Sequence, residues 1–166
     1  MSKLQKIAGS FKISLGSHEA LSELLAYMRA AIDLHQVHHW QTRGSTYYAD
    51  HLLFERIYNE SVPFVDHVAE KSIGLGSVDL VDLCQQSEMR HRFIMSMCSG
   101  TSTVSPQEMV ERSLQAEMTL VGMIKQTIET LEAGGQLSHG LSNLLEGIGD
   151  THESFIYLLK QRNEQV

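Results

Sequence analysis

Apolar residues recur along this chain at the spacing of α-helices, and short polar or glycine-containing stretches separate the helical segments. In the first segment, Leu25, Met28 and Ile32 fall within roughly 80° of one another on a helical wheel, so they define one buried face. Ser17 is a suitable N-cap for this helix, and Gly44 is a suitable end. The pattern therefore predicts a long amphipathic helix between these two residues.

Three more long helices are expected, together with a shorter one in the connection after the second. Their ranges are 46–73, 78–97 (the short helix), 105–133 and 138–162. The helix from 105 has the clearest start, because Ser105 is the N-cap, Pro106 is the first helical residue and Glu108 completes a capping box. No segment alternates as a β-strand does. The pattern predicts an all-α four-helix bundle with a short extra helix in the long connection between its second and third helices.

Length and composition fit one ordered domain. The chain has 166 residues, of which 42% are hydrophobic and 20% are charged, as in ordinary globular proteins. We expect residues 17–166 to form the bundle and residues 1–16 to form a flexible N-terminal arm. The arm carries Lys3, Lys6 and Lys12 and no acidic residue.

The charge balance limits the classes of partner. The formal net charge is −7, which disfavours a protein that grips nucleic acid mainly by charge and favours one that attracts cations. Three lysines in the arm supply few phosphate contacts, so DNA binding through them is the weaker alternative. Two cysteines cannot form a secreted disulfide framework, and no apolar run reaches the 18 residues of a membrane span. We expect a cytoplasmic protein without membrane contact.

Candidate metal ligands are concentrated in the second predicted helix. His51 and Glu55 are four residues apart, as are Asp66 and Glu70, so each pair projects to one side of the helix. Imidazole and carboxylate ligands suit iron or manganese. Acidic residues at this spacing are also common on solvated helix faces, so spacing alone leaves the metal site as one of two interpretations.

One copy of this helix cannot bring the two pairs together, because His51 and Asp66 are roughly 22 Å apart along its axis. Both His51 with Glu70 and Glu55 with Asp66 are centred on the same point, between residues 60 and 61. If two copies cross antiparallel about a two-fold axis there, each pair of chains forms two equivalent sites. His39, on the inward face of the first helix, could add a nitrogen ligand or could be a hydrogen-bonded core histidine.

The stretch from His39 to Gly76 resembles the Dps family of mini-ferritins. The positions that carry the resemblance, matched without a gap, are His39-Trp40, Gly44, Tyr47-Tyr48, His51, Phe54, Tyr58, Asp66, Ala69-Glu70 and Leu75-Gly76. The resemblance implies a ferritin-like bundle assembled into a hollow dodecamer. It further implies that such a cage binds ferrous iron, oxidises it with hydrogen peroxide or more slowly with oxygen, and stores the ferric product, which protects the cell from oxidative damage.

The same resemblance implies an intersubunit ferroxidase centre. Its ligands would be His39, His51 and Glu55 of one chain with Asp66 and Glu70 of its two-fold partner. The family usually has Asp where this chain has Glu55, so we expect a retained but slightly rearranged site.

Two other functions remain open from the sequence. One is a cage that compacts the nucleoid by binding DNA through Lys3, Lys6 and Lys12, with weak or lost ferroxidase activity. The other is a helical shell protein that has kept the fold and lost the chemistry.

Overall fold

The computed structural model describes residues 16–75, 78–98 and 104–164 and consists there of helices. The elements are α1 (Ser17–Gln41), α2 (Tyr47–Gly74), the 3-10 helix η2 (Val78–Val81), α3 (Leu83–Met97), α4 (Pro106–Ala133) and α5 (His139–Asn163). Lys3, Lys6, Lys12 and Gly76 lie outside the described residues. None of the helices in the described ranges is long and apolar enough to cross a membrane.

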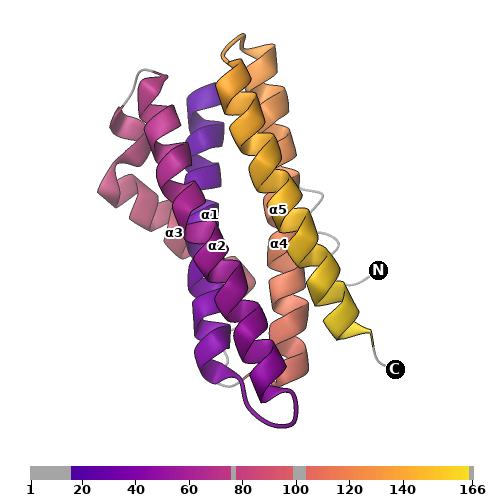
Figure 1. Ribbon diagram of the computed structural model, residues 1–166. Helices are drawn as coiled ribbons and strands as arrows, with labels where there is room; N and C mark the ends of the chain where they lie inside the picture. The colour runs from indigo at the N-terminus through magenta and orange to yellow at the C-terminus, as the bar shows by residue number, and fades with distance from the viewer. Residues whose placement is uncertain (1–15, 76–77, 99–103, 165–166) are drawn as a thin grey trace, which may run out of the picture.

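The four long helices form the predicted bundle, and the connection between α2 and α4 carries α3 (Figure 1). α1 and α2 are an antiparallel hairpin, and so are α4 and α5. α2 and α4 run in the same direction, because the chain returns along the bundle through α3 before α4 begins. α3 packs against α1, where the rings of Tyr27 and Phe93 meet edge to face at 5.1 Å and Arg90 pairs with Asp33.

The helix starts match the sequence prediction at two positions and differ at one. Ser105 Oγ accepts the backbone N–H of Glu108 at 3.1 Å, and Ser138 Oγ accepts that of Leu141 at 3.2 Å. Ser17, predicted as an N-cap, is instead the first helical residue, and Gly16 is the cap. The helix starts one residue earlier because Glu19 folds back to accept the Gly16 N–H at 3.3 Å.

The predicted helix over 78–97 is two elements, because the chain is interrupted at Asp82. The Asp82 carboxylate accepts the backbone N–H of Gln85 at 2.8 Å and so caps α3 at its N-terminus. Gln86, one residue further, is buried and donates to the Leu80 carbonyl at 2.9 Å, which holds η2 against α3.

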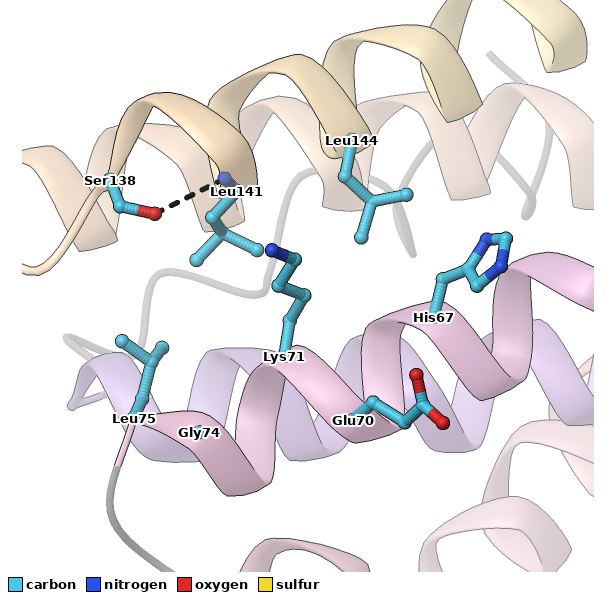
Figure 2. A pocket seen from close by; sticks show the side chains of 8 residues that line it. All are labelled: His67, Glu70, Lys71, Gly74, Leu75, Ser138, Leu141 and Leu144. Atoms are coloured by element: carbon cyan, nitrogen blue, oxygen red, sulfur yellow. Dashed lines mark hydrogen bonds between the residues drawn. The ribbon is translucent and has the colours of Figure 1, made fainter.

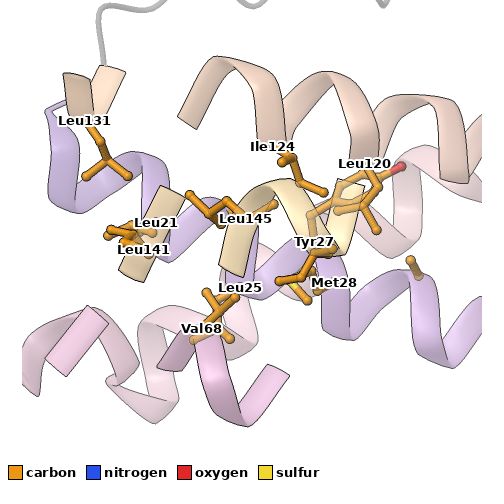
Figure 3. Packing of buried hydrophobic residues seen from close by; sticks show 13 residues of the cluster. Leu21, Leu25, Tyr27, Met28, Val68, Leu120, Ile124, Leu131, Leu141 and Leu145 are labelled. Atoms are coloured by element: carbon orange, nitrogen blue, oxygen red, sulfur yellow. The ribbon is translucent and has the colours of Figure 1, made fainter. Parts of the chain in front are cut away.

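Two buried apolar clusters stabilise the bundle. The larger one joins all four long helices and is built from Leu21, Leu24, Leu25, Tyr27, Met28, Ala31, Val68, Leu120, Ile124, Leu131, Leu141, Leu145 and Ile148 (Figure 3). The smaller one contains Phe54, Ile57, Val104, Met109, Val110, Phe155 and Leu159. The helical periodicity of these positions is what made the bundle predictable from sequence.

A polar layer of three side chains, Glu117, His35 and His152, lies at the level where α4 and α5 pass from the larger to the smaller cluster. Glu117 of α4 is 0% exposed and accepts hydrogen bonds from His35 Nε2 at 2.8 Å and His152 Nδ1 at 2.5 Å. Burial tends to raise the pKa of Glu117, but the hydrogen bonds from His152 and His35 outweigh it and lower the pKa from 4.5 to about 2. A buried carboxylate is therefore kept ionised by two imidazoles from α5 and α1.

The N-terminus of α2 is fixed to the end of α5. Arg162 donates from Nε to Asp50 Oδ1 at 2.6 Å and from Nη2 to Asp50 Oδ2 at 3.0 Å. The same guanidinium reaches Thr46 Oγ1 at 3.3 Å. This bidentate pair holds the first turn of α2, where His51 is located, at a defined place on the bundle.

Candidate metal centre

The structure brings together two of the predicted ligands, His39 at the end of α1 and His51 at the start of α2. Their rings stack with centroids 3.7 Å apart and an interplanar angle of 24°. Both side chains are half-buried. The turn between the two helices, which contains Gly44 with φ of +81°, folds α2 back along α1 so that the rings meet.

Reciprocal hydrogen bonds fix the tautomer of the two rings. His39 Nδ1 lies 3.0 Å from the His51 carbonyl oxygen, and His51 Nδ1 lies 3.1 Å from the His39 carbonyl oxygen. A carbonyl oxygen can only accept, so each Nδ1 must carry the proton and donate it. In its neutral form each ring then has an unprotonated Nε2, which is the form that binds a metal cation.

Two tyrosines flank the imidazole pair. The ring of Tyr47 lies 5.1 Å from that of His51, and the ring of Tyr58 lies 5.5 Å from that of His39 in an edge-on arrangement. These contacts limit rotation of the imidazoles. Tyr47 and Tyr58 belonged to the matched family pattern, but their packing against the two predicted ligands could not be read from the sequence.

The three predicted carboxylate ligands lie on the outer face of α2. Glu55 is half-buried, whereas Asp66 and Glu70 are exposed. In the described part of the chain, no group of three His, Cys, Asp or Glu side chains could hold a metal ion. A single protomer therefore presents an imidazole pair and a separate acidic pair, and does not by itself complete a site.

The face of α2 that carries these acids is also apolar. At 100° per residue, Glu55, Asp66 and Glu70 lie in the same arc of the helix, about 80° wide, as a row of exposed apolar residues. That row is Tyr48, Leu52, Val62 and Ile73, all exposed large hydrophobic residues. Trp40, next to His39, is 66% exposed. Several large apolar side chains exposed along one helix face are typical of a protein–protein interface.

A groove of about 630 Å³, lined in part by Glu70, lies between the C-terminal half of α2 and the start of α5 (Figure 2). Lys71 extends across this groove toward Leu141, whereas Glu70 points away from Lys71 (Figure 2). The Glu70 side chain is exposed, and no ion pair joins it to Lys71 in the described part of the chain.

Comparisons with known proteins agree with this architecture. A family profile described as the ferritin-like domain matches residues 18–165. The chain belongs to the ferritin-like family. No curated protein matches it in sequence.

Solved structures of Dps proteins have the same fold. Dps from Staphylococcus aureus is 19% identical, with a TM-score of 0.76, and 90% of this chain aligns with 96% of that one. DpsC from Streptomyces coelicolor is 26% identical, with a TM-score of 0.75, and 90% of this chain aligns with 84% of that one. Dps from Thermosynechococcus elongatus is 19% identical, with a TM-score of 0.73 and coverage of 90% and 91%. These matches confirm both the resemblance to Dps and the ferritin-like bundle.

Proposed function

We propose that this ferritin-like protein is a Dps-like ferroxidase that oxidises ferrous iron at sites shared by two protomers and stores the ferric product in a cage. The observation that carries the proposal is the His39–His51 pair, in which both Nε2 atoms are available for a cation while no carboxylate among the described residues of the same chain completes the site. Imidazole nitrogen with carboxylate oxygen is a donor set suited to iron.

A second copy of the chain supplies the carboxylates that the imidazole pair lacks. When two α2 helices cross antiparallel about a two-fold axis between residues 60 and 61, His51 faces Glu70 of the partner subunit and Glu55 faces the partner's Asp66. The same register sets the exposed Tyr48 against the partner's Ile73, so the apolar surface is buried as the ligands meet. One isologous contact then explains why the exposed face of α2 carries both acidic and apolar residues.

The chemistry of the proposed site balances with peroxide as the oxidant. Two ferrous ions each lose one electron to hydrogen peroxide, the O–O bond breaks, and two ferric ions form. With hydrolysis, two Fe²⁺, one H₂O₂ and two H₂O yield two FeOOH and four protons. Carboxylates such as Glu55, Asp66 and Glu70 stabilise the higher charge of the ferric product, and a shared site lets two electrons reach the same peroxide without release of hydroxyl radical.

Complementation between two inactive variants tests the shared site directly. His51→Ala removes the imidazole half, and Asp66→Ala removes the acidic half, so each homogeneous protein is expected to lose rapid iron oxidation. In a dimer with one chain of each, one of the two sites has intact His51 and an intact partner Asp66. If equal amounts assemble at random, half of the dimers are mixed, and about a quarter of the wild-type activity returns.

The matched control mixes His51→Ala with His39→Ala. Both changes affect the imidazole half, so every site stays defective and no activity is expected. Stopped-flow oxidation of ferrous ion, with peroxide and with oxygen compared, measures both mixtures after their assembly size has been checked. Equal activity of the two mixtures would contradict a shared site, and wild-type rates in His51→Ala alone would contradict the ligand assignment.

The cage, taken as a dodecamer, and the DNA-binding alternative remain predictions. The first is measured by light scattering of the purified protein. The second depends on Lys3, Lys6 and Lys12, and a gel shift at two salt concentrations measures it, because binding by an arm of lysines weakens steeply with salt.

A further inference from the structure

Thr42 lies at the point where the two imidazoles of the candidate site meet. Thr42 is the residue that follows α1 and is only 8% exposed. Its hydroxyl Oγ1 donates to the His39 carbonyl oxygen at 2.8 Å and lies 3.3 Å from His51 Nδ1. Thr42 therefore contacts both halves of the imidazole pair, whereas Tyr47 and Tyr58 each contact one ring.

The His39 carbonyl is the acceptor that depends on this contact. It is in the last turn of α1, where backbone carbonyls lack an intrahelical partner. It accepts the Thr42 hydroxyl and the His51 Nδ1 proton, so both of its lone pairs are used. Removal of the hydroxyl leaves the carbonyl held by one bond and removes the polar atom next to His51 Nδ1.

We infer that Thr42 is a positioning residue for a metal cation at the His39–His51 pair. By holding the His39 carbonyl, its hydroxyl keeps the His51 ring in the orientation and tautomer that leave Nε2 open. Groups that orient metal-binding imidazoles in this way typically change metal affinity by about 10–100-fold when they are removed. The inference rests on the proposed function, since it assumes that the pair binds a cation.

Three variants of the assembled protein separate this role from a structural one. Thr42→Val keeps the branched shape and removes the hydroxyl, and Thr42→Ser restores the hydroxyl. Thr130→Val is the control, because the Thr130 hydroxyl likewise donates to a backbone carbonyl, that of Gln126 at 2.8 Å, in α4. Cobalt(II) is the probe, since its visible absorption reports both binding and the ligand geometry.

Thr42→Val is expected to bind cobalt at least tenfold more weakly and with an altered visible spectrum. Thr42→Ser and Thr130→Val are expected to bind within about twofold of the wild type. Cobalt affinity and spectrum unchanged in Thr42→Val would overturn the inference.

A crystal structure of metal-free Thr42→Val gives a second measurement that does not depend on metal binding. We expect the bond from His51 Nδ1 to the His39 carbonyl to be lost or the ring stack of 3.7 Å to open. If wild-type protein binds no cobalt, the proposed function fails, and the crystal structure still decides whether Thr42 positions the rings. Rings that keep the stack and both reciprocal bonds in Thr42→Val would overturn the positioning role.

Discussion

Replacement of Glu117 by Gln is expected to destabilise the bundle, because no amide can satisfy both buried imidazoles in their present state. The Glu117 carboxylate accepts from His35 Nε2 and from His152 Nδ1. Gln offers one acceptor oxygen and an NH₂ group that donates, so one imidazole has to accept instead. Its proton must then move to the other ring nitrogen.

That other nitrogen is poorly placed to carry a proton. His35 Nδ1 and His152 Nε2 are both buried, and neither has a hydrogen-bond partner among the described residues. A buried donor without a partner costs about 1–3 kcal/mol. Glu117→Gln thus loses a hydrogen bond to a charged carboxylate and leaves one buried imidazole N–H without an acceptor.

The pKa of Glu117 gives a similar magnitude. Hydrogen bonds from the two histidines lower this pKa from 4.5 to about 2 against the opposing effect of burial. At about 1.4 kcal/mol per pKa unit, the ionised side chain contributes about 3 kcal/mol to the free energy of unfolding at pH 7. For a chain of this size, the loss lowers the melting temperature by roughly 6–12 °C.

Urea unfolding of wild type and Glu117→Gln, at one protomer concentration and at several pH values, measures the effect. The pKa of Glu117 is lower in the folded protein than in the unfolded chain, so the unfolded chain binds more protons between pH 4.5 and about 2. The contribution of ionised Glu117 to the free energy of unfolding is therefore complete above pH 4.5 and is lost as the pH falls toward 2. The difference in unfolding free energy between wild type and Glu117→Gln should become smaller over the same range.

The matched control is Glu129→Gln, also in α4, whose exposed carboxylate lies 4.0 Å from Lys125 Nζ. Exposed pairs of this kind contribute little, so a change below about 0.5 kcal/mol is expected. Glu117→Gln as stable as the control at pH 7 would refute the role of the ionised carboxylate. So would a loss of unfolding free energy that is the same at pH 7 and pH 3.

Three further predictions concern stability. Phe155→Ala empties a fully buried site in the smaller apolar cluster and should cost about 3–5 kcal/mol in urea unfolding. Arg162→Ala leaves the buried Asp50 carboxylate without its bidentate partner, so we expect the free energy of unfolding to fall by about 2 kcal/mol. A loss no larger than that caused by replacing an exposed arginine would contradict a stabilising role of the Arg162–Asp50 pair. Burial lowers the pKa of His38 from 6.5 to about 3, so the unfolded chain binds a proton at this residue more readily than the folded protein does. The free energy of unfolding therefore falls as the pH drops from 6.5 toward 3. In urea unfolding, His38→Gln should make the free energy of unfolding less dependent on pH over this range.

The amino-acid sequence by itself determined the helices and the family. Apolar spacing predicts four long helices because burial of one face is what stabilises a helix in a bundle, and capping residues such as Ser105 and Ser138 mark their starts through local hydrogen bonds. The N-cap at Gly16 and the break at Asp82 were missed. Each depends on one side chain that folds back onto the backbone, as Glu19 and Asp82 do, and periodicity does not report such bonds.

Sequence spacing also selected His51, Glu55, Asp66 and Glu70 as candidate ligands, and the resemblance to Dps added His39; their identity as ligands stays a prediction. Only the tertiary structure decided that His39 and His51 stack and exchange hydrogen bonds with each other's backbone, and that Thr42 supports them. It alone showed that Glu117 joins His35 and His152. The contacts of Glu117 join helices that are distant in sequence, and those between His39 and His51 join the facing ends of α1 and α2. Both follow from how the helices pack and not from the pattern along any one helix.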